Sequence, residues 1–443
     1  MMMRVPYIAG RWVRGRDHYG RRRPINHLLN VDAPAIWIVG TRRMGKTSLL
    51  RQIELETDRL DSDMVPLFWD LQGCESFDDL SYELFLALED VADRFHALGV
   101  DVESMENKDA VAILRRLNRA LSERNKRLIV LIDEAETLIN IGRQDPKWVG
   151  RLRAGFNDNR QRTVVTSTKL LSLLNDTSES KDMPFLYGFS MVNLWSLDPG
   201  ASMALVRQTQ NQYSVNVDDL LMEQILTNTN RHPYLLQYLC QRLFVADSEC
   251  SGYLRPIEEH DLKANHLLSG FFDIDFQHLT QLERRIMLAV GSMTVATDHD
   301  LIQAMAPESP DRIRLFAYGL DKLGYLRKTF GQWALGNEYL RGWLEGNFDR
   351  LSQGGKALLD DNNIEILLQI GRQNELTYLH QEVLRLQTRL RTLLTQQVNG
   401  NANDMRTVNR EIHQLQNALK MVKQEISLIP PEESSLTHSI PEK

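Results

Sequence analysis

The feature that most constrains this chain is a glycine-rich loop between an apolar run and a helical pattern. Residues 35–39 read Ala-Ile-Trp-Ile-Val and lead directly into Gly-Thr-Arg-Arg-Met-Gly-Lys-Thr-Ser at 40–48. A short, continuous apolar run predicts a strand that is buried on both faces. The spacing of the glycines, lysine and threonine is that of a phosphate-binding loop, which requires a strand before it and a helix after it. This context favours a phosphate-binding loop over a simple turn.

Each residue type in the loop fits a bound nucleotide. The glycines let successive backbone N–H groups face one point, and the start of the helix adds the positive end of its dipole. Lys46 is expected to contact the β- and γ-phosphates, and the Thr47 hydroxyl to hold Mg²⁺. The sequence therefore predicts ATP or ADP, with Mg²⁺, bound by the loop residues Gly40, Thr41, Arg42, Arg43, Met44, Gly45, Lys46, Thr47 and Ser48.

A pair of acids follows a second apolar run, about 85 residues after the loop. Residues 128–132 are Leu-Ile-Val-Leu-Ile, and Asp133 and Glu134 come next. A buried parallel strand delivers its last residues to the carboxyl edge of the sheet, where ligands bind. We expect Asp133 to hold Mg²⁺ through water and Glu134 to polarise the attacking water. Glu134 and the phosphate-binding Lys46 are the predicted catalytic residues. Glu136 receives no catalytic role.

Three further runs complete the expected sheet. Residues 66–70 and 163–168 lie between helical patterns, and a fifth strand is expected at 191–195. The fold class is thus an α/β P-loop ATPase core, in which helices flank a parallel sheet. The fourth run ends at Thr168, whose hydroxyl is either a sensor of the γ-phosphate or a cap for the following turn.

Several stretches resemble the STAND ATPases, which are AAA+-like signal-transduction ATPases close to the archaeal ATPase group. The loop and the Asp-Glu-Ala-Glu strand end at 133–136 carry this resemblance. So do Tyr-Ile-Ala-Gly at 7–10, Thr-Lys-Leu-Leu at 168–171 and Arg-His-Pro-Tyr-Leu-Leu-Gln at 231–237. The resemblance implies an N-terminal segment over the adenine, formed by Tyr19, Gly20 and Arg21, and a base contact from Pro233. The family has glycine where this chain has Arg231, and glutamate where it has Arg22. An arginine at 231 is a second candidate phosphate sensor.

After the core, helices are expected at 199–211, 217–228 and 233–246, as in a small lid. Residues 279–348 predict a winged helix, with a capping box at Thr280 and Glu283 and a hairpin around Gly331. Its candidate reading helix at 310–323 has nearly balanced charge, which favours packing within the chain over binding to a DNA groove.

Two heptad patterns near the C-terminus are interrupted at residues 399–403, which predicts an antiparallel hairpin of helices. This hairpin packs with copies of itself, binds a partner or has a purely structural role. The expected division of the chain is a basic N-terminal segment 1–30, an ATPase core 31–197, a helical lid 198–270, a winged helix 271–350, a linker 351–363, a coiled-coil hairpin 364–429 and a disordered tail 430–443.

Composition adds bounds on location and partners. The net charge of -7 does not fit a generic polyanion binder. The three cysteines are too few and too scattered for a disulfide framework or a zinc site. No apolar run is long enough to span a bilayer, and no signal-peptide pattern is present, so a cytoplasmic protein without membrane contact is expected.

The combined prediction is a slow ATPase that acts as a switch. In the ATP state it self-associates and recruits a protein effector through 364–429; by analogy with the class, it acts in prokaryotic conflict or antiviral signalling. The alternative is an AAA+ DNA-binding ATPase of the origin-recognition or transposition type. It would use the winged helix and the basic segment 1–30, although nucleic acid is the less favoured partner.

Overall fold

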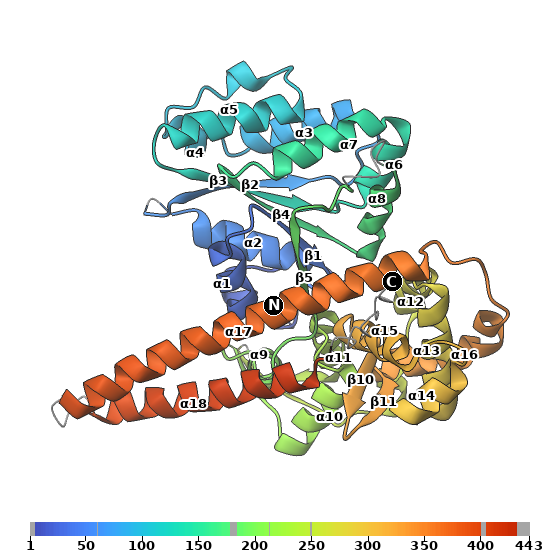
Figure 1. The fold of residues 1–443 in the computed structure, drawn as a ribbon. Coiled ribbons are helices and arrows are strands. Elements are labelled where there is room, and N and C mark those ends of the chain that lie inside the picture. Colours follow the sequence, from blue (N-terminus) through green and yellow to red (C-terminus); the bar gives the residue numbers. More distant parts are fainter. Residues whose placement is uncertain are drawn as a thin grey trace, which may run out of the picture.

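The N-terminal half of the chain forms a five-stranded parallel sheet in the order β2-β3-β4-β1-β5 (Figure 1). The computed structural model describes residues 5–431 except 60, 178–183, 212, 249 and 400–404. The strands are β1 (Ala35–Val39), β2 (Met64–Asp70), β3 (Arg127–Asp133), β4 (Gln161–Ser167) and β5 (Phe189–Asn193). The predicted α/β P-loop ATPase core is confirmed.

Helices cover both faces of this sheet, which explains why its strands are apolar throughout. Trp37 and Val130 point toward one layer of helices, whereas the alternate residues Ile36 and Ile129 point toward the other. The first layer contains α3 (Phe77–Glu89), α5 (Ala110–Ser122) and α7 (Pro146–Phe156), and the second contains α1 (Arg22–Asn30) and α2 (Lys46–Thr57). Shorter helices are α4 (Ala92–His96), α6 (Thr137–Gln144), α8 (Leu174–Thr177), η1 (Gly15–Asp17), η2 (Glu103–Met105) and η3 (Lys169–Leu173).

The next segment combines helices with a small sheet that the sequence did not predict. Its helices are α9 (Pro199–Val206), α10 (Asp219–Thr229), α11 (Pro233–Leu243), η4 (Glu259–Leu262) and α12 (His266–Gln277). The strands β6 (Ser214–Asn216), β7 (Phe244–Ala246) and β8 (Ser251–Leu254) form the sheet in the order β6-β8-β7. The helix expected at 233–246 therefore ends at Leu243. Its last residues pair instead with β8, where Gly252 has no side chain to collide with Phe244.

Residues 281–352 form four helices and an antiparallel three-stranded sheet in the order β10-β11-β9. The elements are α13 (Gln281–Met293), β9 (Ala296–Thr297), α14 (Asp298–Ala304), α15 (Pro310–Lys322), β10 (Leu326–Thr329), β11 (Gln332–Leu335) and α16 (Glu338–Ser352). The predicted capping box of Thr280 and Glu283 starts α13. The predicted hairpin turns at Phe330 and Gly331, which both have positive φ.

Two long helices, α17 (Asp361–Asn399) and α18 (Met405–Leu428), end the described chain and project past the rest of the molecule (Figure 1). The predicted turn at 399–403 and tail at 430–443 lie mostly outside the described residues. The first half of α17 packs on the core, because Gly371 brings it against Met191 of β5 and Gly319 of α15 admits Leu368. Among the described helices, none combines the length and hydrophobicity needed to cross a membrane.

Candidate functional site

The phosphate-binding loop leaves β1 at Gly40 and enters α2 at Lys46. Gly45 has φ +91°, a conformation that glycine adopts without strain, and it starts α2 without a side-chain cap. The first N–H groups of the helix are thus left to other acceptors. The Lys46 ammonium lies inside the loop, 3.0 Å from the Gly40 carbonyl oxygen and 3.1 Å from that of Thr41. This set of donors fits a phosphate chain.

The acid pair stands at the same edge of the sheet. Asp133 ends β3, is 2% exposed and accepts a hydrogen bond from the Thr166 hydroxyl of β4. Partial burial raises the pKa of Glu134, the carboxylates of Glu136 and Asp133 add to this rise, and Lys46 opposes it. The Lys46 charge thus acts directly on Glu134, so the structure brings the predicted lysine and acids together.

Two neighbours of the acid pair were not assigned from the sequence. Thr166 is one of several hydroxyl residues in β4, and only its contact with Asp133 distinguishes it from the others. Glu136 accepts a hydrogen bond from the Thr168 N–H, so it links the end of β3 to the end of β4. The Thr168 side chain itself accepts from the Leu170 N–H, 3.4 Å away, which is the capping geometry that was one of its two expected roles.

The residues predicted to hold Mg²⁺ are compatible with that ion but do not form a cage around it. Thr47 lies in the first turn of α2, and Asp133 ends β3. Mg²⁺ is usually bound by one or two protein oxygens together with phosphate and water. Within the described part of the chain, no group of three or more His, Cys, Asp or Glu residues could hold a metal ion.

The N-terminal segment lies between the loop and the lid. Arg21 is buried and donates to the Met44 carbonyl of the loop at 3.2 Å and to the Ser196 carbonyl at 3.4 Å. Burial lowers the pKa of Arg21 to about 10. Tyr19 is buried in the apolar core of the lid, and Gly20 lies so close to α9 that a Cβ there would be 2.6 Å from that of Ala201. Their adenine contact stays a prediction.

The start of α11 faces the loop from the lid. Pro233 occupies its first turn, and the Nδ1 atom of the preceding His232 accepts from the Leu235 N–H at 3.5 Å. One pocket is lined by the loop residues Thr41, Arg42 and Arg43 together with His232 and residues of α12. Arg231 has φ +56°, and burial lowers its pKa while the nearby carboxylates of Asp198 and Asp321 oppose this shift. Its role as a sensor also stays a prediction.

The loop arginines contact downstream helices, a use of them that was not predicted. Arg42 Nη1 lies 3.5 Å from Asp275 Oδ1 and 3.3 Å from His278 Nδ1. Arg43 donates to the Gly10 carbonyl at 3.0 Å, and its guanidinium lies 4.9 Å from the centre of the Phe271 ring. The sequence carries no signal for this contact, because α12 contains two acids, Asp273 and Asp275, and only the second lies near Arg42.

Comparisons with known proteins agree with this geometry. Residues 30–174 match the family described as "AAA domain". The chain is similar in structure to a Walker-type ATPase of Pyrococcus abyssi, with 16% identity, a TM-score of 0.53 and coverage of 76% of this chain and 98% of that one. A weaker similarity is to the ORC2 protein of Aeropyrum pernix, whose structure is of its ADPNP-ADP complexes. The identity is 12%, the TM-score is 0.43, and the match covers 80% of this chain and 98% of that one. No curated protein matches the chain. Residues 30–174 thus match an AAA domain, and the parallel sheet with its phosphate-binding loop has the fold of a P-loop ATPase core.

Proposed function

We propose that this chain is an ATP-hydrolysing switch of the STAND type, in which the nucleotide sets how the downstream helices sit on the ATPase core. The observation that carries this proposal is the contact of Arg42, in the phosphate-binding loop, with Asp275 and His278 of the α12 end. A ligand shifts a conformational equilibrium only through contacts that differ between the two states. A loop that holds phosphate and is also held by a downstream helix provides such contacts.

Within the core, each residue has a defined role. The loop N–H groups and Lys46 would hold the β- and γ-phosphates, and Thr47 and Asp133 would hold Mg²⁺. Mg²⁺ held there would supply positive charge to offset the charge that develops on the phosphates. Glu134 orients the attacking water and accepts its proton, for which its raised pKa is favourable. Slow hydrolysis resets the switch.

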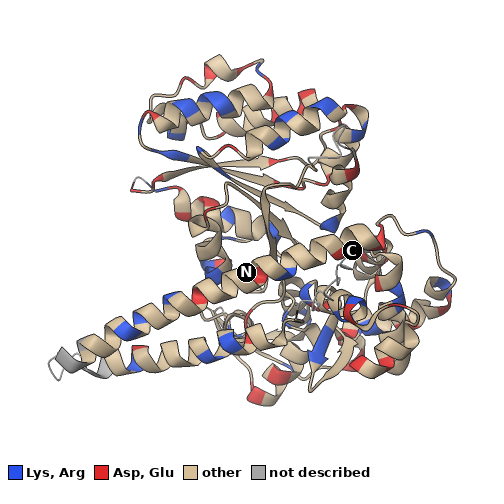
Figure 2. Ribbon diagram, in the orientation of Figure 1, with Lys and Arg blue, Asp and Glu red and all other residues tan. Residues whose placement is uncertain are grey.

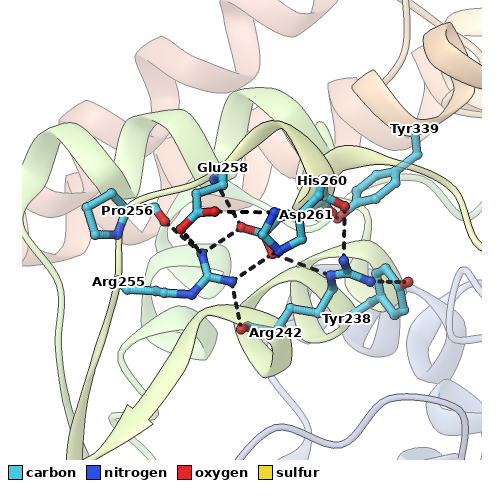
Figure 3. A network of polar contacts seen from close by, with 8 residues as sticks. All are labelled: Tyr238, Arg242, Arg255, Pro256, Glu258, His260, Asp261 and Tyr339. Carbon is cyan, nitrogen blue, oxygen red and sulfur yellow. Dashed lines mark hydrogen bonds and ion pairs between the residues drawn. The ribbon is translucent and has the colours of Figure 1, made fainter.

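The lid (residues 198–270) and the segment 281–352 move together as one unit, the downstream body, because a polar network joins them (Figure 3). Asp261 is fully buried and accepts from both terminal nitrogens of Arg255, at 2.7 and 2.9 Å. The backbone oxygen of Asp261 accepts from the Tyr339 hydroxyl of α16 at 2.9 Å. A second link runs from Arg327 of β10 to the Thr227 carbonyl of α10 at 2.7 Å. Movement of the lid therefore carries α16 with it.

The helical hairpin reports this movement, because it contacts both bodies. Arg23 of α1 pairs with Glu425 of α18, whereas Lys322 of α15 lies 2.7 Å from Glu375 of α17. A change in angle between the core and the downstream body must alter one of these contacts. We infer that the ATP state frees the hairpin for self-association and for a protein effector bound through 364–429, as in the conflict and antiviral signalling of the class.

The alternative is an AAA+ ATPase of the origin-recognition or transposition type. The N-terminal segment favours it, because Trp12 is 46% exposed beside the exposed Arg11, Arg14 and Arg16. Helix α15, the candidate reading helix, argues against binding in a DNA groove. Its Arg312 and Arg314 pair with acids of the same chain, and its Gly319 faces α17. Figure 2 shows both charge signs interspersed over the downstream segment.

One experiment separates the two functions. Native mass spectrometry of the full chain, with ADP or a non-hydrolysable ATP analogue and with or without duplex DNA, reads nucleotide content and stoichiometry together. The switch predicts larger assemblies with the analogue, regardless of DNA. A steeply salt-dependent DNA complex in either nucleotide state would instead support the alternative, because phosphate contacts release counterions.

A further inference from the structure

The C-terminal end of α12 places a buried carboxylate among the cations of the phosphate-binding loop. Asp275 is 7% exposed, and its Oδ1 atom lies 3.5 Å from Arg42 Nη1. Tyr325 and Lys46 both favour the ionised form of the same carboxylate and so act against the rise in its pKa. His278 accepts from Arg42 through Nδ1, a role that requires a neutral ring.

A carboxylate in this position depends on the positive charge of the loop. Burial raises the pKa of Asp275 to about 6, and the charges of Arg42 and Lys46 act in the opposite direction. A buried charge is costly unless it is paired, so the contact is favourable only while these cations are not fully neutralised by another anion. The position of α12 is therefore sensitive to negative charge in the loop.

A second ion pair joins the same two parts of the chain. Lys169, which follows β4, pairs with Glu283 of α13, and both side chains are buried. Glu283 also completes the capping box of α13, so replacing it would disturb the helix as well as the pair. Asp275 has no capping role and is the better residue to test.

We propose that Asp275 makes the site discriminate against a nucleoside triphosphate, because its carboxylate shares Arg42 and Lys46 with the phosphate chain. While Asp275 lies beside the loop, the site accepts a diphosphate, but the Asp275 carboxylate repels the additional negative charge of a γ-phosphate. A triphosphate binds only when α12 withdraws from the loop. This inference rests on the proposed function and names the group through which the switch senses the nucleotide.

The test compares two isosteric variants of the full-length chain by calorimetric titration with Mg-ADP and with a non-hydrolysable Mg-ATP analogue. Asp275→Asn removes the charge at the loop. Asp273→Asn, the control, removes a charge from the same helix that pairs with Arg350 away from the loop. Coupling between sites typically changes affinity by about 5- to 150-fold. We expect Asp275→Asn to improve the affinity for the analogue relative to ADP roughly tenfold, and Asp273→Asn to leave that ratio unchanged.

Hydrogen exchange of the unmodified chain gives a second readout that needs no variant. We expect the amides of His266–Gln277 to lose protection with the analogue but not with ADP. Equal protection in both states, or an unchanged affinity ratio in Asp275→Asn, would overturn the role of Asp275 while leaving nucleotide binding intact. A chain that binds neither nucleotide would overturn both this inference and the proposed function.

Discussion

Arg23 of α1 and Glu425 of α18, which are 402 positions apart in the sequence, form a bidentate ion pair with nitrogen–oxygen distances of 3.2 and 3.0 Å. The Arg23 guanidinium also lies 5.3 Å from the centre of the Tyr378 ring of α17. A single side chain from the ATPase core thus contacts both helices of the hairpin. This residue fastens the hairpin to the core.

Glu425→Gln should therefore loosen the hairpin without unfolding the protein. Both partners are about one-third or more exposed, so the pair contributes less than about 1 kcal/mol to the free energy of unfolding. Hydrogen exchange should show faster exchange in α17 and α18, while the melting temperature hardly changes. Glu411→Gln is the matched control, because its partner Arg389 lies within the hairpin. Equal effects from the two variants would contradict a fastening role for Arg23.

Glycine at 319 should be required for the docking of α17 on α15. A Cβ at this position collides with Leu368, so Gly319→Ala should lower the free energy of unfolding by about 1–3 kcal/mol, as overpacking does. Gly342→Ala in α16 meets no atom within 4 Å and should stabilise that helix by about 0.5–1 kcal/mol. Denaturant titration should show a lower free energy of unfolding for Gly319→Ala and a higher one for Gly342→Ala.

Acid should weaken the network that joins the lid to α16. The Arg255 guanidinium is the main cause that lowers the pKa of Asp261 from 3.8 to about 2. A carboxyl group with a lowered folded-state pKa stabilises the fold fully above its unfolded value, and this stabilisation is lost as the pH falls from about 4 through about 2. The free energy of unfolding should therefore decline over this window.

Asp261→Asn tests the assignment. It should cost about 1–3 kcal/mol at neutral pH, because hydrogen bonds to a charged group are lost while Arg255 stays partly solvated. It should also flatten the decline in stability between about pH 4 and pH 2. Glu259→Gln, whose exposed ion pair with Lys263 lies beside this network, should do neither. An unchanged acid profile in Asp261→Asn would show that another group causes the decline.

The ATPase core could be predicted from the sequence because its signals are local. The apolar runs at 35–39 and 128–132 correspond to β1 and to most of β3. Both strands lie parallel in one sheet with β4 between them, which brings Lys46 near Glu134. Loop spacing and buried strands are properties of neighbouring residues. The catalytic and metal-binding roles remain predictions.

The contacts around the site could not be predicted, because they join distant segments. Arg42 and Asp275 are 233 positions apart, and each is unremarkable within its own helix or loop. Thr166 is one hydroxyl in a strand rich in hydroxyls, and only the register of β3 and β4 brings it to Asp133. The strand at Phe244 likewise depends on its pairing with β8.

Glu134→Gln should separate nucleotide binding from hydrolysis. The amide cannot accept the proton of the attacking water, so turnover should fall by about 10²–10⁴-fold while Mg-ATP still binds. Glu123→Gln is the control, because this residue forms an exposed ion pair with Arg119 at the end of α5, before the start of β3. Phosphate release and calorimetric titration measure the two effects. Normal turnover in Glu134→Gln would remove this residue from its catalytic role.

The central claim is that the loop at Gly40–Ser48 binds Mg-ATP through its N–H groups and the buried Lys46 ammonium. Calorimetric titration of the full-length chain and of Lys46→Ala with Mg-ATP tests this claim most directly. We expect one nucleotide per chain for the unmodified protein and no measurable binding for the variant, with both proteins folded. Equal affinity in the two proteins would show that the nucleotide, if bound, lies elsewhere.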